Sequence, residues 1–229
     1  MSVESRENGA AEGQAQERGR RGRFVTFEGG EGCGKSTQVR RLKESLEADG
    51  VEVVLTREPG GTPLAEEIRR LIKDPSADPP CDRSELLLFL AARAQLVRNV
   101  IRPALAAGKW VVSDRFSDST VAYQGYGRGL SLAFIASADE FACEGLRPDL
   151  TILLDVRPET AAARLRGREA ATHTAADRIE RAGEEFHARL RKGFAALANA
   201  EPARILTVDA NGTPDEVWEK VWMSLKRFR

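Results

Sequence analysis

The chain has 229 residues, of which 41% are apolar, enough to form a buried core. Basic and acidic residues number 35 each, so no net positive field favours nucleic acid as a partner. No run of 18 or more apolar residues occurs, which argues against a membrane partner. Cys33, Cys81 and Cys143 match neither a zinc site nor a disulfide framework, so we expect a reducing, cytoplasmic location.

Residues 1–23 differ from the rest in composition. Gly, Glu, Gln and Arg dominate there, and Val3 is almost the only large apolar residue. Such a segment buries too little apolar surface to offset the entropy lost on ordering. We therefore predict a disordered tail at 1–23, with its basic cluster at 18–23 solvated, followed by one domain at 24–229.

A Walker A pattern follows the tail. Its predicted phosphate-binding residues are Gly29, Gly30, Glu31, Gly32, Cys33, Gly34, Lys35, Ser36 and Thr37. A β-rich run at 24–28 precedes the pattern, and Val39, Leu42 and Leu46 follow it at helical spacing. Backbone N–H groups of such a glycine-rich loop, with the positive end of the next helix, bind phosphate. We expect Lys35 at the outer phosphates and Ser36 at Mg²⁺.

Strands and helices alternate through the remaining chain. We predict strands at 51–55, 110–113, 150–154 and 204–208, and helices at 63–72, 82–107, 131–145, 158–166, 177–200 and from 213 onward. Thr62 before Pro63 indicates an N-cap, Asp82 with Glu85 indicates a capping box, and Thr213 with Glu216 indicates the start of the final helix. A bend is expected before Pro103. The alternation predicts an α/β fold with a five-stranded parallel sheet, whose ligands bind at the carboxyl ends of the strands.

Two further groups of residues are candidates for chemistry. Asp114 ends an apolar strand, where it suits a Walker B role at Mg²⁺ or simply caps a turn, and Arg115 beside it suits a phosphate. Phe89 and Arg93 lie four residues apart on one helix face, where a flat ring and a phosphate-binding arginine suit a nucleotide whose base lies on the ring. The alternative is a core Phe89 and an Arg93 in a surface ion pair.

Several separated motifs together resemble bacterial thymidylate kinase. They are Thr-Arg-Glu-Pro-Gly-Gly-Thr at 56–62, Phe89 with Arg93 and Gln95, the run from Asp114 through Gly125, and residues 147–155. The resemblance covers about 24–229 and implies a three-layer P-loop kinase fold, its sheet flanked by helices, with a basic lid at about 164–178. It also implies Mg²⁺-dependent transfer of the γ-phosphoryl group of ATP to dTMP, giving dTDP, by a homodimer.

The resemblance also implies roles for individual residues. The implied dTMP contacts are Glu31, Arg57, Pro59, Phe89, Arg93, Arg115, Ser119, Thr120, Tyr123 and Gln124. The implied metal ligands are Ser36 and Asp114. The implied catalytic residues are Lys35, Arg115, Arg168 and Glu31. Phe89 stacks on thymine, Arg93 contacts the base edge, Tyr123 blocks a ribose 2′-hydroxyl and Glu31 accepts the 3′-hydroxyl. Pro59 is expected to be cis.

The lid is where the chain departs from the family pattern. The resemblance implies Arg164 and Arg166 at ATP and Arg168 at the transferring group, where positive charge on the equatorial oxygens assists phosphoryl transfer. Residues 169–176 form a longer, more Ala- and Thr-rich segment than compact bacterial lids have. The choice among the three arginines therefore stays open.

Two other functions are compatible with a Walker A pattern. A P-loop switch needs a guanine-reading Asn-Lys-x-Asp, which is absent, and the Asp-x-x-Gly at 209–212 follows the last strand, too late to sense a γ-phosphate. That stretch is interpreted as a loop beside adenine. The second alternative is a related nucleoside or nucleoside-monophosphate kinase with a different base choice.

Overall fold

The computed structural model describes residues 22–74, 78–172, 178–179 and 182–226. Apart from residues 22 and 23, the predicted disordered tail lies outside the described residues, as does the lid segment 173–177. Within the described part of the chain, no helix is both long and apolar enough to cross a membrane.

A five-stranded parallel sheet organises the fold, as predicted. Its strands are β1 (Phe24–Glu28), β2 (Val53–Arg57), β3 (Trp110–Asp114), β4 (Leu150–Asp155) and β5 (Ile205–Asp209), in the spatial order β2-β3-β1-β4-β5. β2 begins two residues later than predicted, because the Val51 N–H donates to the Leu46 carbonyl in the preceding turn. Pairing with β3 starts only at Val53, opposite Trp110.

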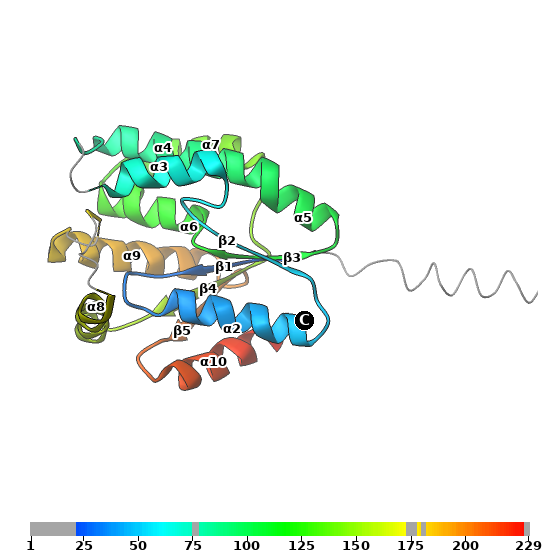
Figure 1. Cartoon of the computed structure of the whole chain (residues 1–229). Coiled ribbons are helices and arrows are strands. Elements are labelled where there is room, and N and C mark those ends of the chain that lie inside the picture. Colours follow the sequence, from blue (N-terminus) through cyan, green and yellow to red (C-terminus); the bar gives the residue numbers. More distant parts are fainter. Residues whose placement is uncertain (1–21, 75–77, 173–177, 180–181, 227–229) are drawn as a thin grey trace, which may run out of the picture.

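Helices cover both faces of the sheet. They are α2 (Lys35–Ala48), α3 (Pro63–Lys73), α4 (Asp82–Leu96), α5 (Arg102–Ala106), α6 (Ser117–Thr120), α7 (Leu132–Cys143), α8 (Pro158–Thr172), α9 (Glu184–Ala200) and α10 (Pro214–Lys226), with π-helical turns η1 (Val97–Ile101) and η2 (Val121–Gly127). Figure 1 shows α2 and α10 on one face, α9, α6 and the α3–α4–α7 group on the other, and α8 at the carboxyl edge. This is the predicted three-layer arrangement.

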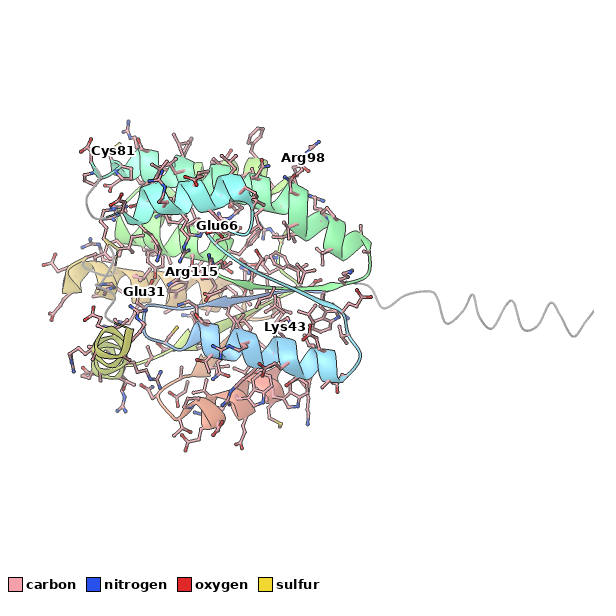
Figure 2. The ribbon with its side chains drawn as sticks, viewed as in Figure 1. Glu31, Lys43, Glu66, Cys81, Arg98 and Arg115 are labelled. Atoms are coloured by element: carbon pink, nitrogen blue, oxygen red, sulfur yellow. The ribbon has the colours of Figure 1, made fainter. Side chains whose placement is uncertain are left out.

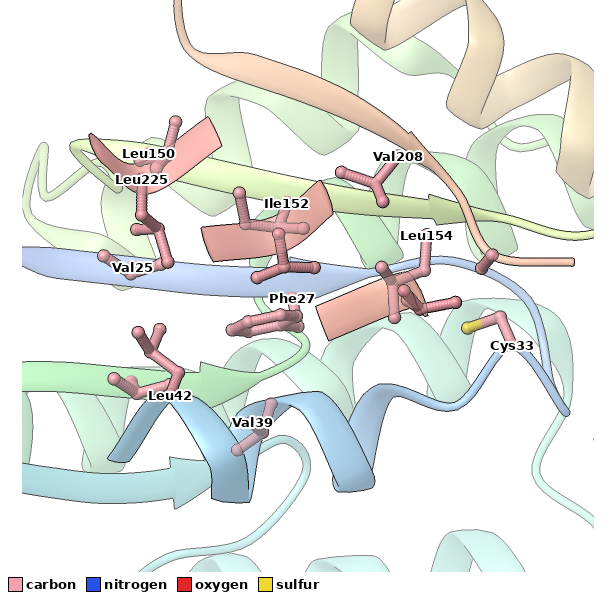
Figure 3. Packing of buried hydrophobic residues seen from close by; sticks show 14 of the residues in the cluster. Val25, Phe27, Cys33, Val39, Leu42, Leu150, Ile152, Leu154, Val208 and Leu225 are labelled. Atoms are coloured by element: carbon pink, nitrogen blue, oxygen red, sulfur yellow. The ribbon is translucent and has the colours of Figure 1, made fainter. Parts of the chain in front are cut away.

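The alternation of β1 divides the core between the two faces. Val25 and Phe27 pack with Leu42 of α2 and Leu225 of α10, as Figure 3 shows. Thr26 points to the opposite face, where its hydroxyl lies 2.8 Å from that of Thr151 in β4. Glu28, on that same face, is fully buried.

Two of the three predicted helix starts are confirmed. The Ala65 N–H donates to Thr62 Oγ1 at 3.2 Å, and Thr213 and Glu216 form a reciprocal capping box at 2.7 and 3.3 Å. The capping box at Asp82 is wrong, because Cys81 is the N-cap residue and Asp82 is already helical. Glu85 turns inward instead, and only 1% of its surface is exposed.

The predicted helix 82–107 runs as α4, η1 and α5. The Arg102 N–H donates to the Val97 carbonyl, five residues back. Proline lacks an N–H, so a widened turn just before Pro103 absorbs the break in the hydrogen-bond ladder. The predicted bend is thus present as a π-helical turn.

Other helix bounds differ from the sequence prediction. α8 continues six residues beyond the predicted end at 166, since the Ala-rich run at 170–171 favours helix. α9 begins at Glu184, after Gly183 in the N-cap position, and not at 177. No helix is predicted at 117–127, yet α6 and η2 occupy that stretch.

Candidate active site

The Walker loop connects β1 to α2 at the carboxyl edge of the sheet. Gly29 and Gly34 have φ of 135° and 92°, and a Cβ at Gly29 would lie 2.5 Å from the Leu154 carbonyl oxygen. The first turn of α2 carries no acidic residue. Lys35 Nζ donates to the carbonyls of Gly29 at 3.1 Å and Gly30 at 2.9 Å. The glycine-rich loop, the helix N-terminus and the lysine therefore lie together, which is the arrangement that a phosphate site needs.

Ser36 and Asp114 come together beside this loop. Ser36 Oγ donates to Asp114 Oδ2 at 3.0 Å, although 78 positions separate the two residues. Among the described residues, no group of three or more His, Cys, Asp or Glu side chains could hold a metal ion. A hydroxyl and one carboxylate are hard oxygen donors that fit Mg²⁺ when substrate phosphates and water supply its other ligands.

Arg115 lies between the Walker loop and the π-helical turn η2, and it contacts both. Its backbone has φ 75°, and its guanidinium donates to the Gly29 carbonyl at 2.9 Å and to Glu31 Oε1 at 2.6 Å. The Tyr123 hydroxyl donates to the same Glu31 oxygen at 3.1 Å, and Arg115 lies 4.9 Å from the centre of the Tyr123 ring. Figure 2 shows Glu31 and Arg115 together at this edge of the sheet.

Neighbouring positive charges keep Glu31 ionised. Burial alone would raise the pKa of this carboxyl, but the positive charges of Arg115, Lys35 and Lys73 lower its pKa to about 2. Glu31 is therefore ionised at neutral pH, and it can accept hydrogen bonds from a ligand hydroxyl.

One cavity of about 400 Å³ joins these groups. The predicted residues that line it are Glu31, Gly32, Gly34, Lys35, Ser36, Thr37, Arg57, Pro59, Phe89, Arg93, Asp114, Arg115, Ser119, Thr120, Tyr123, Gln124, Arg164 and Arg168. Gly29, Gly30, Cys33 and Arg166 are not among the lining residues. The sequence thus points to most of the side chains that meet there.

Two basic residues at the cavity were missed from the sequence. Arg69 and Lys73 lie one turn apart on α3 and line it, beside the buried stripe of Ile68 and Ile72. Arg69 donates to the Pro59 carbonyl at 2.9 Å. The available signal was a basic pair at helical spacing next to an apolar stripe.

Arg93 lies in a buried ion-pair cluster, and not in the surface ion pair that was the alternative. It is 1% exposed, and it donates to Glu58 Oε2 and to Asp139 Oδ1, at 2.6 Å in each case. Glu58 precedes Pro59 through a cis peptide bond, as expected for Pro59. Phe89, one turn before Arg93, is partly buried and lines the cavity, so the predicted shared face exists.

Basic side chains also border the cavity. Arg57 is exposed and pairs with Glu66 at 3.1 Å. Arg164 of α8 donates to the carbonyls of Gly212 at 2.7 Å and Gly32 at 3.4 Å. Arg164 and Arg168, one helical turn apart, line the cavity, whereas Arg166 is not among its lining residues. The helical periodicity of α8 thus separates three arginines that the sequence spaces evenly.

Comparisons with known proteins show which family this chain resembles. The family model described as thymidylate kinase matches residues 27–221. The thymidylate kinase of Solidesulfovibrio magneticus is 52% identical over 201 residues, covering 87% of this chain and 96% of that protein. That of Synechococcus sp. strain JA-3-3Ab is 49% identical over 203 residues, covering 89% and 95%.

A solved structure agrees with the sequence matches. The crystal structure of thymidylate kinase from Ehrlichia chaffeensis is 34% identical, with a TM-score of 0.72, and the match covers 89% of this chain and 98% of that one. Fold, motif order and sequence identity all point to the same family. The chain belongs to the thymidylate kinase family.

Proposed function

We propose residue roles for the reaction that family membership assigns to this chain, the phosphorylation of dTMP to dTDP with ATP. One observation carries the proposal: the Walker loop and the aromatic face of α4 line the same cavity. A donor phosphate on Lys35 and a base on Phe89 would therefore place an acceptor phosphate between them, near Arg115. Positioning of this kind supplies much of the rate of phosphoryl transfer.

On the donor side, main-chain N–H groups of the Walker loop bind the ATP phosphates. Lys35, Arg115 and Arg168 act on the transferring group, where positive charge on its equatorial oxygens lowers the barrier. Arg164 contacts ATP from α8, and its hydrogen bond to the Gly212 carbonyl supports the proposal that the loop 209–212 lies beside adenine. A contact from Arg166 requires α8 to rotate, since this side chain is not among those that line the cavity.

On the acceptor side, Phe89 stacks on thymine and Arg93 contacts the base edge, with Thr120 and Gln124 beside the nucleoside. Arg93 keeps N–H groups beyond those that Glu58 and Asp139 accept, because a guanidinium has five.

The sugar and phosphate of dTMP have their own contacts in this proposal. Glu31 accepts the 3′-hydroxyl, and Tyr123 fills the space that a 2′-hydroxyl would need. Arg57, Pro59, Arg115 and Ser119 face the acceptor phosphate. The low pKa of Glu31 supports its part, since an ionised carboxylate is a strong acceptor.

Mg²⁺ is the proposed metal, held by Ser36 and Asp114. It would neutralise phosphate charge during the transfer. The 3.0 Å contact between the two side chains supports the proposal that both bind the same Mg²⁺ ion.

We also propose a homodimer formed through α4 and α7. These helices pack against each other, and each carries exposed large apolar side chains: Leu87 of α4 is 57% exposed, and Phe134 and Phe141 of α7 are 56% and 88% exposed. Such side chains on neighbouring helices favour burial against a second copy.

The three free thiols support a cytoplasmic location.

An ADP-release assay tests the reaction. ATP and Mg²⁺ are combined with dTMP, dUMP, CMP, AMP or thymidine as acceptor. We expect dTMP to stimulate ADP release most strongly. No stimulation by dTMP would refute the assignment, stronger stimulation by another acceptor would favour a kinase with a different base choice, and equal turnover without acceptor would favour a switch.

A further inference from the structure

A buried carboxylate outside the cavity holds one of the cavity residues. Glu85, in the first turn of α4, is 1% exposed and is not among the lining residues. Its Oε1 accepts hydrogen bonds from Gln124 Nε2 at 3.0 Å and Arg128 Nε at 3.2 Å. Its Oε2 accepts from Arg128 at 3.3 Å and from Arg178. We name these four residues the Glu85 cluster.

The cluster determines which way the Gln124 amide points. An ionised carboxylate can only accept hydrogen bonds, so Gln124 must present its NH₂ group to Glu85. Burial alone would raise the pKa of Glu85, but hydrogen bonds from Arg178, Gln124 and Arg128 lower it below its ordinary value. The carbonyl oxygen of Gln124 has no hydrogen-bond partner among the described residues, and Gln124 lines the cavity.

The other cluster members restrict Glu85 itself. Arg128 bridges both carboxylate oxygens, and Arg178 also donates to the Ile72 carbonyl at 3.4 Å. Arg178 follows α8, whereas Arg128 follows η2, so Glu85 is held from two separate segments of the chain. A carboxylate held on both oxygens cannot rotate to release the Gln124 amide.

We infer that Glu85 is a positioning residue for base choice: it holds Gln124 so that a carbonyl oxygen faces the cavity beside Arg93. The inference rests on the proposed function. Arg93 can only donate, and with the Gln124 carbonyl it offers one donor and one acceptor. Thymine presents the complement, a 4-carbonyl acceptor next to an N3–H donor. Cytosine presents the reverse, a 4-amino donor next to an unprotonated N3.

Glu85→Gln tests the inference in the full chain. A glutamine at this position offers both a donor and an acceptor, so the Gln124 amide is free to turn over. We expect the ratio of kcat/KM for dTMP over dCMP to fall about tenfold, because one well-placed hydrogen bond gives discrimination of about this size. The fall should come mainly from a higher KM for dTMP, with the KM for ATP changed less than about twofold.

Asp82→Asn is the matched control. Asp82 lies on the same helix, one turn earlier, and pairs with Arg128 at 3.5 Å without a contact to Gln124. This variant also removes a negative charge beside Arg128, but it leaves the hydrogen bond between Glu85 and Gln124 in place. The ratio of kcat/KM for dTMP over dCMP should therefore stay at the wild-type value. An equal fall of the ratio in both variants, or an equal loss of turnover with dTMP and dCMP in Glu85→Gln, would overturn the inference.

Two further observations separate the possible failures. A wild-type chain without dTMP-stimulated turnover refutes the proposed function, whereas an active wild type with an unchanged ratio in Glu85→Gln refutes only the role of Glu85. If Glu85→Gln does not fold, a wild-type crystal structure with dTMP decides. Gln124 within hydrogen-bond distance of both Glu85 and the base N3 supports the inference, and Gln124 turned away from Glu85 overturns it.

Discussion

Arg115 and Glu31, 84 positions apart in the chain, form an ion pair of 2.6 Å between the end of β3 and the Walker loop. The backbone of Arg115 adopts φ 75°, which is unfavourable for a residue with a Cβ. Its N–H donates to the Phe27 carbonyl at 2.9 Å, and its side chain is held by Gly29 and Glu31. The surrounding contacts therefore impose the conformation that places this guanidinium between the Walker loop and the cavity.

Lys35→Ala should lower kcat about 10²- to 10³-fold, since a cation at the transferring phosphates is lost. ADP release at saturating substrates measures the effect. Lys43→Ala is the control, because Lys43 lies on the same helix and pairs with Glu47 at 2.6 Å. Figure 2 shows Lys43 away from Glu31 and Arg115. Near-normal turnover of Lys35→Ala would reject the role of the loop.

Asp114→Asn should raise the Mg²⁺ concentration needed for half-maximal rate by about tenfold or more, because one charged ligand is removed. Rate is measured against free Mg²⁺ at fixed ATP and dTMP. Asp155 ends strand β4, which β1 separates from β3, and it is not among the residues that line the 400 Å³ cavity, so Asp155→Asn is the control. An unchanged Mg²⁺ requirement in Asp114→Asn would contradict the metal assignment.

Phe89→Ala should raise KM for dTMP about tenfold, since stacking of a base on an aromatic ring contributes about 1–3 kcal/mol. The KM for ATP should change less than about twofold. Phe89→Tyr keeps the ring and should behave like the wild type. Equal increases of both KM values would mean that Phe89 supports the fold and not the base.

Glu28 should make stability depend on pH. Its Oε1 accepts from the N–H groups of Phe116 at 2.8 Å and Ser119 at 3.2 Å, at the start of α6. Burial, together with the negative charge of Asp118, raises its pKa from 4.5 to about 7. Between these values the folded state keeps a proton that the unfolded state releases, so stability falls as pH rises from 4.5 through 7.

Glu28→Gln removes this titration, so the wild type should lose roughly 2–3 kcal/mol more than the variant between pH 5 and pH 8. Urea unfolding at the two pH values measures the difference. Glu47→Gln, at an exposed site on α2, reports the general effect of an amide replacement. Parallel losses in wild type and Glu28→Gln would show that Glu28 does not titrate in this range.

Phe141→Glu should shift the protein from dimer to monomer in sedimentation velocity, because a charge at the proposed interface opposes association. Phe141 is 88% exposed in the single chain, so the substitution leaves the core intact. Met223→Glu is the control: it is 57% exposed on α10, in the opposite layer. A dimer that persists in Phe141→Glu would exclude this face.

Local sequence determined the Walker loop, the alternation of elements and most of the cavity residues. Glycine at positions of positive φ, Thr62 as an N-cap and apolar periodicity act over a few neighbouring residues, so they can be read directly. Polar residues that follow apolar strands meet at one edge because the strands are parallel. Asp114 and Arg115 could be placed at the site for this reason.

Only the tertiary structure decided the partners of the buried charges. Nothing local distinguishes a Glu85 that caps a helix from one that holds Gln124, or an Arg93 at the surface from one between Glu58 and Asp139. Desolvation decides these cases. A charge that long-range packing removes from water must be paired by whichever groups the same packing brings near.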